Sequence, residues 1–99
     1  MGLEFVKGLQ GDDPKYLKVV ATAKHYAVHS GPESTRHSFN AKVSEVDLRE
    51  TYLPAFKSLV QKSDVRQVMC AYQRLDDEPC CGNTQLLQRI LRDEWGYKY

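Results

Sequence analysis

The sequence predicts an α/β fold of about two parallel βα units, which belong either to a barrel or to a doubly wound sheet. Two observations support this prediction. Residues 18–28, KVVATAKHYAV, and residues 66–72, RQVMCAY, are β-branched or apolar runs of strand length. Each run is followed by a segment whose apolar residues have helical spacing. This alternation is typical of parallel strands, because a parallel connection needs a crossover, usually a helix.

The first residues predict the end of a helix. Residues 1–11 carry spaced apolar side chains, and Gly8 and Gly11 are expected to close the helix. Residues 12–17, DDPKYL, predict a turn because Pro14 fixes φ in a polar context. The first strand then follows.

The first crossover helix is predicted after a polar loop at residues 30–38. Ser44 and Asp47 stand three residues apart, as in a capping box. Pro54 lies inside the helical pattern and should kink or split the helix near Leu53, because proline cannot donate a backbone hydrogen bond. The apolar stripe of this helix comprises Tyr52, Leu53, Phe56, Leu59 and Val60.

The second strand, residues 66–72, is apolar on both faces, which predicts a strand covered on both sides. Asn83 is the expected N-cap of the helix that follows, and Gly96 is its expected end. The apolar stripe of that helix comprises Leu86, Leu87, Ile90, Leu91 and Trp95.

The charge balance disfavours several classes of partner. Lys and Arg total 14 against 13 Asp and Glu, with both signs interspersed. Nucleic acids and anionic membranes favour clustered basic residues, so neither is expected. The apolar runs are far shorter than the roughly 20 residues that cross a bilayer. Residues 1–4, MGLE, lack the features of a signal peptide, so we expect any export signal to lie outside this chain.

Candidate functional residues lie where the predicted strands end. Lys24 and His25 close the first strand, and residues 71–73, AYQ, close the second. Active sites of parallel βα folds are built at the carboxyl ends of strands, so these groups are candidates for binding a polar ligand. However, adjacent residues of a strand point to opposite sides. Lys24 and His25 can share one pocket only if the strand has ended or bulged there.

Metal and redox sites are not indicated. His25, His29 and His37 lie on a strand and a loop, where their spacing does not gather ligands as it does on a helix. Cys80 and Cys81 are adjacent and lack the two-residue spacer of thioredoxin-like motifs. The three cysteines leave two alternatives open: a disulfide from Cys70 to either Cys80 or Cys81, or three reduced thiols. We expect no metal and no cofactor.

The motifs KHY, RHSFNA, ETYLPAFKSLV, VMCAYQ, EPCCGN and LLQRILRDEWGY occur in this order along nearly the whole chain. Together they resemble the N-terminal catalytic domain of glycoside hydrolase family 3, the β-glucosidases and β-xylosidases. The resemblance implies that residues 1–99 are part of a TIM-like (β/α) barrel, which an α/β sandwich domain follows in the family.

The resemblance also implies a retaining glycosidase mechanism. In such enzymes an Asp attacks the anomeric carbon and an acid protonates the leaving oxygen, with the two carboxyl groups about 5 Å apart. By the same resemblance, Lys24 and His25 bind hydroxyls of the sugar at the cleaved end, and Tyr72 sits near the nucleophile. Arg36 and His37 shape the pocket rim.

The resemblance further implies a disulfide between Cys70 and Cys81, which leaves Cys80 unpaired. Gln73 departs from the family, which usually has Asn there, so its polar contact is expected to be longer or redirected. The RHSFNA segment and the stretch from VMCAY to Cys81 favour the xylosidase-type branch.

Residues 96–99, GYKY, stop before the apolar strand and Ser-Asp pair that carry the family's nucleophile. The acid comes from later still. We therefore expect a fragment of a β-glycosidase acting on terminal β-D-xylosyl or β-D-glucosyl residues, without the remaining barrel and the C-terminal domain, and inactive alone. By the family, it is expected to be secreted or periplasmic. The alternatives are a non-catalytic sugar-binding or partner-binding module and, more weakly, a thiol-based redox protein.

Overall fold

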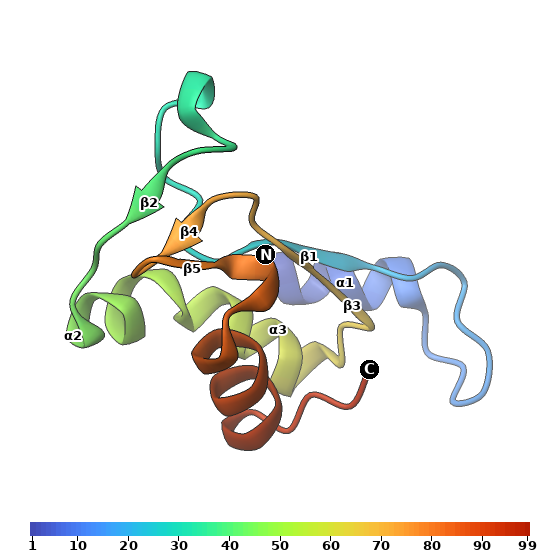
Figure 1. Ribbon diagram of the computed structural model, residues 1–99. Helices are drawn as coiled ribbons and strands as arrows, with labels where there is room; N and C mark the ends of the chain where they lie inside the picture. Colours follow the sequence, from blue (N-terminus) through green and yellow to red (C-terminus); the bar gives the residue numbers. More distant parts are fainter.

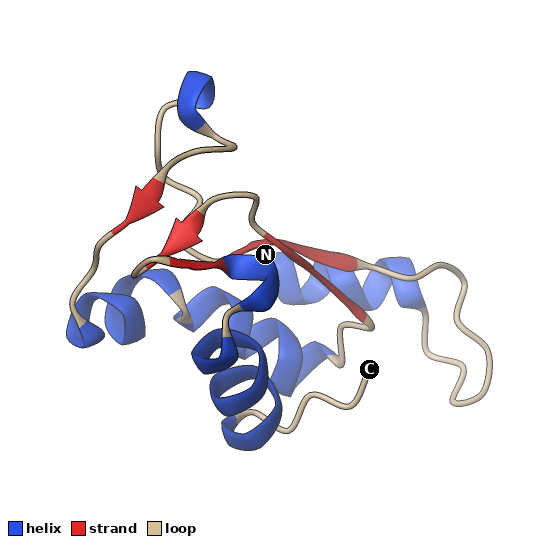
Figure 2. Cartoon of the chain, viewed as in Figure 1, coloured by secondary structure: helices blue, strands red, loops and turns tan.

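Two parallel strands, β1 (Thr22–Tyr26) and β3 (Gln67–Cys70), form the central pair of the computed structural model, which describes residues 1–99. A second, small sheet has the strand order β2-β4-β5. Figures 1 and 2 show both sheets. The other elements are α1 (Gly2–Gln10), η1 (Glu33–Thr35), β2 (Asn40–Ala41), α2 (Glu45–Asp47), η2 (Leu48–Tyr52), α3 (Pro54–Ser63), β4 (Arg74–Leu75), β5 (Glu78–Pro79), η3 (Cys80–Gly82) and η4 (Gln85–Glu94).

Helices cover only one face of the β1–β3 pair. In Figure 1, α1, α3 and η4 all lie on the same side of these strands. Ala23 and Val68 pack toward the helices, whereas Lys24 and Met69 are exposed. The prediction that the second strand is covered on both sides is therefore wrong for this chain. The reason is that the chain contributes a single layer of helices to this sheet.

The first strand is shorter than predicted. The apolar pattern spans residues 18–28, but β1 comprises only Thr22–Tyr26. Val19 and Val20 are 52% and 54% exposed. The pairing ends where the Gln67 backbone N–H donates to the Ala21 carbonyl, and β3 does not extend further back. The two valines have high β propensity, but no strand lies beside them to pair with.

The buried side chain of Gln10 fixes α1 to the start of both strands. Its Nε2 donates to the Asp64 carbonyl at 3.1 Å. Its Oε1 accepts from the backbone N–H of Arg66 at 3.1 Å and that of Ala21 at 3.4 Å. The predicted helix is confirmed, but only Gly11, with φ of 78°, ends it.

The crossover from β1 to β3 follows the sequence pattern closely. Ser44 caps α2, because its Oγ accepts from the Asp47 N–H at 3.0 Å. The chain continues through the wider turn of η2 and breaks at Leu53. Pro54 then begins α3, where a missing N–H costs nothing because the first turn has no partner for it. The predicted split at this proline is confirmed.

The helix after β3, η4, also has the predicted ends. Asn83 Oδ1 accepts from the Leu86 N–H at 2.9 Å. Gly96 adopts φ of 75°, and its N–H donates to the Arg92 carbonyl at 2.9 Å. No helix of the structure has both the length and the apolar character needed to span a bilayer. The main core comprises Tyr26, Ala27, Val28, Ala41, Leu48, Leu53, Ala71, Leu75, Cys80, Leu86, Ile90, Leu91 and Trp95.

The FNAKV pattern of residues 39–43 indicates a short extended segment, and β2 lies within it, but the sequence does not predict the small sheet that β2 forms with β4 and β5. Its strand β2 runs parallel to β4, and β4 runs antiparallel to β5. The hairpin turn uses Asp76 and Asp77, with φ of 48° and 75°. Asn40 and Lys42 both bind the Asp77 carboxylate, and Lys42 is the main reason that the pKa of Asp77 is lowered. Strands of two residues are too short to leave a periodic signal.

Tyr26 provides a test of the main core. Its hydroxyl is buried and donates to the Leu86 carbonyl of η4 at 2.9 Å. We expect Tyr26→Phe to lower the free energy of unfolding by about 1 kcal/mol, because one buried hydrogen bond is lost. Tyr16→Phe is the matched control, since Tyr16 is 67% exposed. Urea unfolding measures both variants, and an equal effect of the two would contradict the assigned bond.

Candidate functional site

An irregularity at His25 lets two adjacent side chains share one pocket. Lys24 pairs with Met69 and Tyr26 with Cys70, so His25 is an extra residue in β1. The alternation of side chains is interrupted at such a bulge. Lys24 and His25 both line an open pocket of about 300 Å³. The other residues that line it are Val28, His29, Ser30, Thr51, Tyr52 and Phe56.

The backbone around this irregularity has an unusual course. The Lys24–His25 and Tyr26–Ala27 peptide bonds are both cis. Directly after them Val28 adopts φ of 59°, a left-handed conformation that β-branched residues rarely adopt. Val28 turns the chain after β1, and His29 lies beside His25.

The pocket is electropositive around His25. Burial is the main reason that the pKa of His25 is lowered from its usual value of 6.5. The positive charges of His29, Lys24 and Arg36 lower it further, while Glu33 opposes them. The rings of His25 and His29 lie 4.7 Å apart. A largely neutral imidazole can both donate and accept hydrogen bonds, which suits a ligand with hydroxyl groups.

The other three predicted residues gather in a second cluster. Tyr72 follows β3 and is 56% exposed. The Arg36 guanidinium lies 5.2 Å from the centre of its ring, and the His37 ring lies 4.8 Å from it. Arg36 also forms an ion pair with Glu33 at 2.9 Å. Such cation–π and ring contacts hold the loop over the aromatic face.

The two groups of candidates lie at the same end of the strand pair but do not share one pocket. Lys24 and His25 lie near the end of β1, and Tyr72 follows β3. Both groups therefore lie at carboxyl ends of parallel strands. Arg36 and His37 come from the loop at residues 30–39, which projects from the body of the molecule in Figure 1. None of the three lines the pocket of Lys24 and His25.

The cysteines pair in one way only. Cys70, at the end of β3, forms a disulfide with Cys81 across a Cα–Cα distance of 5.1 Å. Cys80 is a buried free thiol, and burial raises its pKa. The bond therefore joins the end of β3, two residues before Tyr72, to the segment that precedes η4. No three His, Cys, Asp or Glu side chains gather as a metal site.

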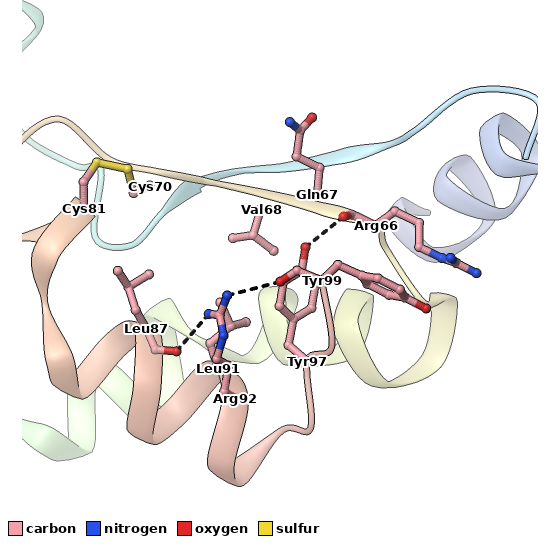
Figure 3. Close-up of a pocket in the computed structure, with 10 residues that line it drawn as sticks. All are labelled: Arg66, Gln67, Val68, Cys70, Cys81, Leu87, Leu91, Arg92, Tyr97 and Tyr99. Carbon is pink, nitrogen blue, oxygen red and sulfur yellow. Dashed lines mark hydrogen bonds between the residues drawn. A yellow bond between two sulfur atoms is a disulfide. The ribbon is translucent and has the colours of Figure 1, made fainter.

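A further groove lies between β3 and η4, away from the predicted site (Figure 3). It measures about 330 Å³, and the Cys70–Cys81 disulfide forms one end. Figure 3 shows Val68 pointing into this space and Gln67 pointing the opposite way. The Tyr97 hydroxyl donates to the Arg66 carbonyl at 2.9 Å. The Tyr97 hydroxyl is thus engaged in an internal bond, whereas the buried Arg66 Nε has no hydrogen-bond partner. None of the predicted sugar-binding residues lines this groove.

Gln73 is a site-related residue whose partner the sequence does not identify. It is 1% exposed, and its Nε2 donates to the carbonyls of Ala27 and Val28, each at 2.9 Å. The only sequence signal was its departure from the Asn usual in the family. The sequence likewise gives no signal that His29 lies beside His25, because the turn that joins them has no sequence signature.

The whole chain matches a known domain. Residues 1–98 match the glycosyl hydrolase family 3 N-terminal domain. A xylan 1,4-beta-xylosidase of Xylanibacter ruminicola is 66% identical over 101 residues, which covers 100% of this chain and 12% of that protein. The exo-1,4-beta-xylosidase bxlB of Emericella nidulans is 49% identical and matches 96% of the chain and 13% of its own length.

Solved structures agree. A family 3 exo-beta-xylosidase, XlnD, in complex with a xylobiose aziridine activity-based probe superposes with a TM-score of 0.91 at 36% identity, over 98% of this chain and 13% of that one. Beta-glucosidase 3B of Thermotoga neapolitana in complex with glycerol gives 0.86 at 38% identity, over 96% and 12%. The chain belongs to glycoside hydrolase family 3. Its expected fold, part of a (β/α) barrel, is confirmed, and the chain spans about an eighth of its relatives' length.

The disulfide has a measurable consequence. We expect one free thiol per denatured chain without reductant and three after reduction. Reduction should lower the free energy of unfolding by about 2–3 kcal/mol, because it frees a short loop in the unfolded chain. Cys80→Ala is the control and should retain the bond with no free thiol. Three thiols without reductant would contradict the pairing.

His25 should make stability depend on pH. Well above pH 6.5 the imidazole is neutral in both the folded and the unfolded chain. As the pH falls below 6.5, the unfolded chain binds the proton first, because the folded-state pKa is lower. The free energy of unfolding should therefore decrease down to the folded-state pKa and receive no further change from His25 below it.

Nuclear magnetic resonance (NMR) titration of the His25 ring protons measures this directly. Lys24→Gln should raise the pKa of His25, because it removes a neighbouring positive charge. Lys15→Gln, in the turn after α1, should leave it unchanged. A pKa at or above 6.5 in the unaltered chain would contradict the described environment.

Proposed function

We propose that residues 1–99 form a fragment of the N-terminal catalytic barrel of a retaining β-glycosidase that releases terminal β-D-xylosyl or β-D-glucosyl residues in carbohydrate breakdown. The observation that carries this proposal is the bulge of β1, which directs Lys24 and His25 into one pocket at the carboxyl end of the strand. Membership of family 3 supports it, because the family's relatives include xylosidases and glucosidases.

Lys24 and His25 act together as the hydroxyl-binding pair in this proposal. The Lys24 ammonium supplies up to three donors and no acceptor. His25, whose pKa is lowered by burial, supplies one donor and one acceptor near neutral pH. Sugar hydroxyls both donate and accept, so the two side chains complement a polyol. Fixed donors and acceptors orient the sugar ring for attack, which is a large part of catalysis in such enzymes.

The second cluster acts at the rim of the same sugar site. In this proposal Tyr72 lies near the reacting centre, and the support is that Arg36 and His37 of the projecting loop contact its ring. The exposed face of β1 and β3, with Lys24 and Met69, becomes the barrel interior when the remaining strands are present. That arrangement brings the cluster of Tyr72 and the pocket of Lys24 toward a common axis.

Xylose is the preferred sugar in this proposal. Its support is the 66% identity to a xylan 1,4-beta-xylosidase and the 49% identity to an exo-1,4-beta-xylosidase. The chain holds neither the nucleophilic Asp of the family's Ser-Asp pair nor the acid. Both carboxyl groups are needed for the covalent glycosyl-enzyme intermediate and its hydrolysis. We therefore propose that the isolated chain binds sugar without cleaving it.

The non-catalytic alternative is a module that binds sugar or a partner in its own right. Its support is that the chain has a core of its own and a defined pocket. The redox alternative has less support, because Cys81 is bonded to Cys70 and Cys80 is buried with a raised pKa. Reactive thiols are accessible and have lowered pKa values.

Two assays on the 99-residue chain test the proposal. Hydrolysis of an aryl β-xyloside should not exceed that of a Lys24→Ala control. Xylose should shift the backbone amide signals of Lys24 and His25 in NMR spectra, and Lys24→Ala should weaken that response about tenfold, because hydrogen bonds to a charged donor are lost. Turnover above the control would disprove inactivity. A xylose response confined to other residues would place the sugar elsewhere.

A further inference from the structure

Gln73 lies at the junction of the two groups of site residues. It directly follows Tyr72 in the chain, and its side chain crosses to the turn that follows β1. The Nε2 group makes two bonds of 2.9 Å, to the carbonyls of Ala27 and Val28. Gln73 is 1% exposed, so these bonds are protected from water and are stronger than the same bonds would be at the surface.

The turn that Gln73 holds is not favourable on its own. Val28 has φ of 59°, and a β-branched residue is strained in this left-handed conformation. The Val28 carbonyl has a second donor, the Ser30 N–H at 3.0 Å. The Ala27 carbonyl has only the weak Cys80 thiol at 3.7 Å besides Gln73. Removing the amide therefore leaves a buried carbonyl poorly satisfied at a strained position.

This turn decides where His29 lies. Its ring stands 4.7 Å from that of His25, and both line the pocket with Lys24. If the turn relaxes, His29 moves and His25 gains access to water. The environment of His25 thus depends on a side chain that does not touch it.

The Gln73 side-chain amide acts through its N–H donors and not through its oxygen. Gln73 Oε1 is buried and has no hydrogen-bond partner. An unsatisfied buried acceptor costs free energy, and an apolar side chain of similar length would avoid that cost. What this amide contributes is therefore the two 2.9 Å bonds that Nε2 makes.

We propose that Gln73 is a positioning residue, which clamps the Ala27–Val28 turn and so orients His25 and His29 in the pocket of Lys24. This inference rests on the proposed function in so far as the pocket binds a sugar. The clamp also joins the two halves of the site, because Gln73 directly follows Tyr72 in the chain and binds the turn after β1.

The experiment compares Gln73→Met with Gln10→Met. Both substitutions remove a buried amide that binds backbone groups, but Gln10 acts at the opposite end of the strands. NMR titration of the full 99-residue chain gives the pKa of His25, and urea unfolding gives the stability. The charged groups around His25 are Lys24, His29, Arg36 and Glu33.

We expect both variants to be less stable but only Gln73→Met to raise the pKa of His25 toward 6.5. A rise of about half a pH unit is expected, which is a threefold gain in proton affinity. Gln73→Asn keeps donors on a shorter side chain and should cause a smaller rise, and it decides the question if the Met variant does not fold.

An unchanged His25 pKa in the folded Gln73 variants, or an equal rise in Gln10→Met, would overturn the positioning role. Xylose binding is measured in parallel and should weaken about threefold in Gln73→Met. An unaltered chain that shows no xylose response would count against the proposed function alone, because the His25 comparison does not require a sugar.

Discussion

A pair of parallel strands leaves backbone groups unpaired at both of its ends, and in this chain two buried glutamine side chains satisfy many of them. Gln10 binds three backbone groups where β1 and β3 begin, and Gln73 binds two where β1 ends. Buried backbone groups without partners are costly, so a sheet of only two strands depends on such side-chain bonds. The helices, the disulfide and the site residues are arranged around this tied pair.

The single extra residue in β1 allows two adjacent side chains, those of Lys24 and His25, to line one pocket. Up to Lys24, alternate residues face the helices and the open side, as in any strand. His25 interrupts this order, so Tyr26 is buried although it would otherwise face the same side as Lys24. One inserted residue therefore places a large aromatic group in the core and a titratable group beside the lysine. At that position burial, and after it the positive charges of His29 and Lys24, lower the pKa of His25.

Local signals in the sequence predicted what depends on local chemistry. The cap at Ser44, the break before Pro54 and the helix end at Gly96 all followed from side chains that act within a few residues. The predictions that failed concerned features that depend on other segments of the chain, far away in the sequence. The length of β1 was set by where β3 begins, and the exposure of Met69 by the absence of a second layer. Likewise, the Gln73 bonds join residues 45 or 46 positions apart, which no periodicity reveals.

The residues of the candidate site are carried by two kinds of structure, strands and a loop. Lys24, His25 and Tyr72 stand at the ends of tied strands, whereas Arg36 and His37 stand on a loop that projects from the body. That loop lies outside the span that the disulfide encloses, and it reaches Tyr72 through ring and cation contacts alone. Loops of this kind tolerate insertion and replacement better than paired strands do. This loop can therefore change in sequence and length while Lys24, His25 and Tyr72 keep their places at the strand ends.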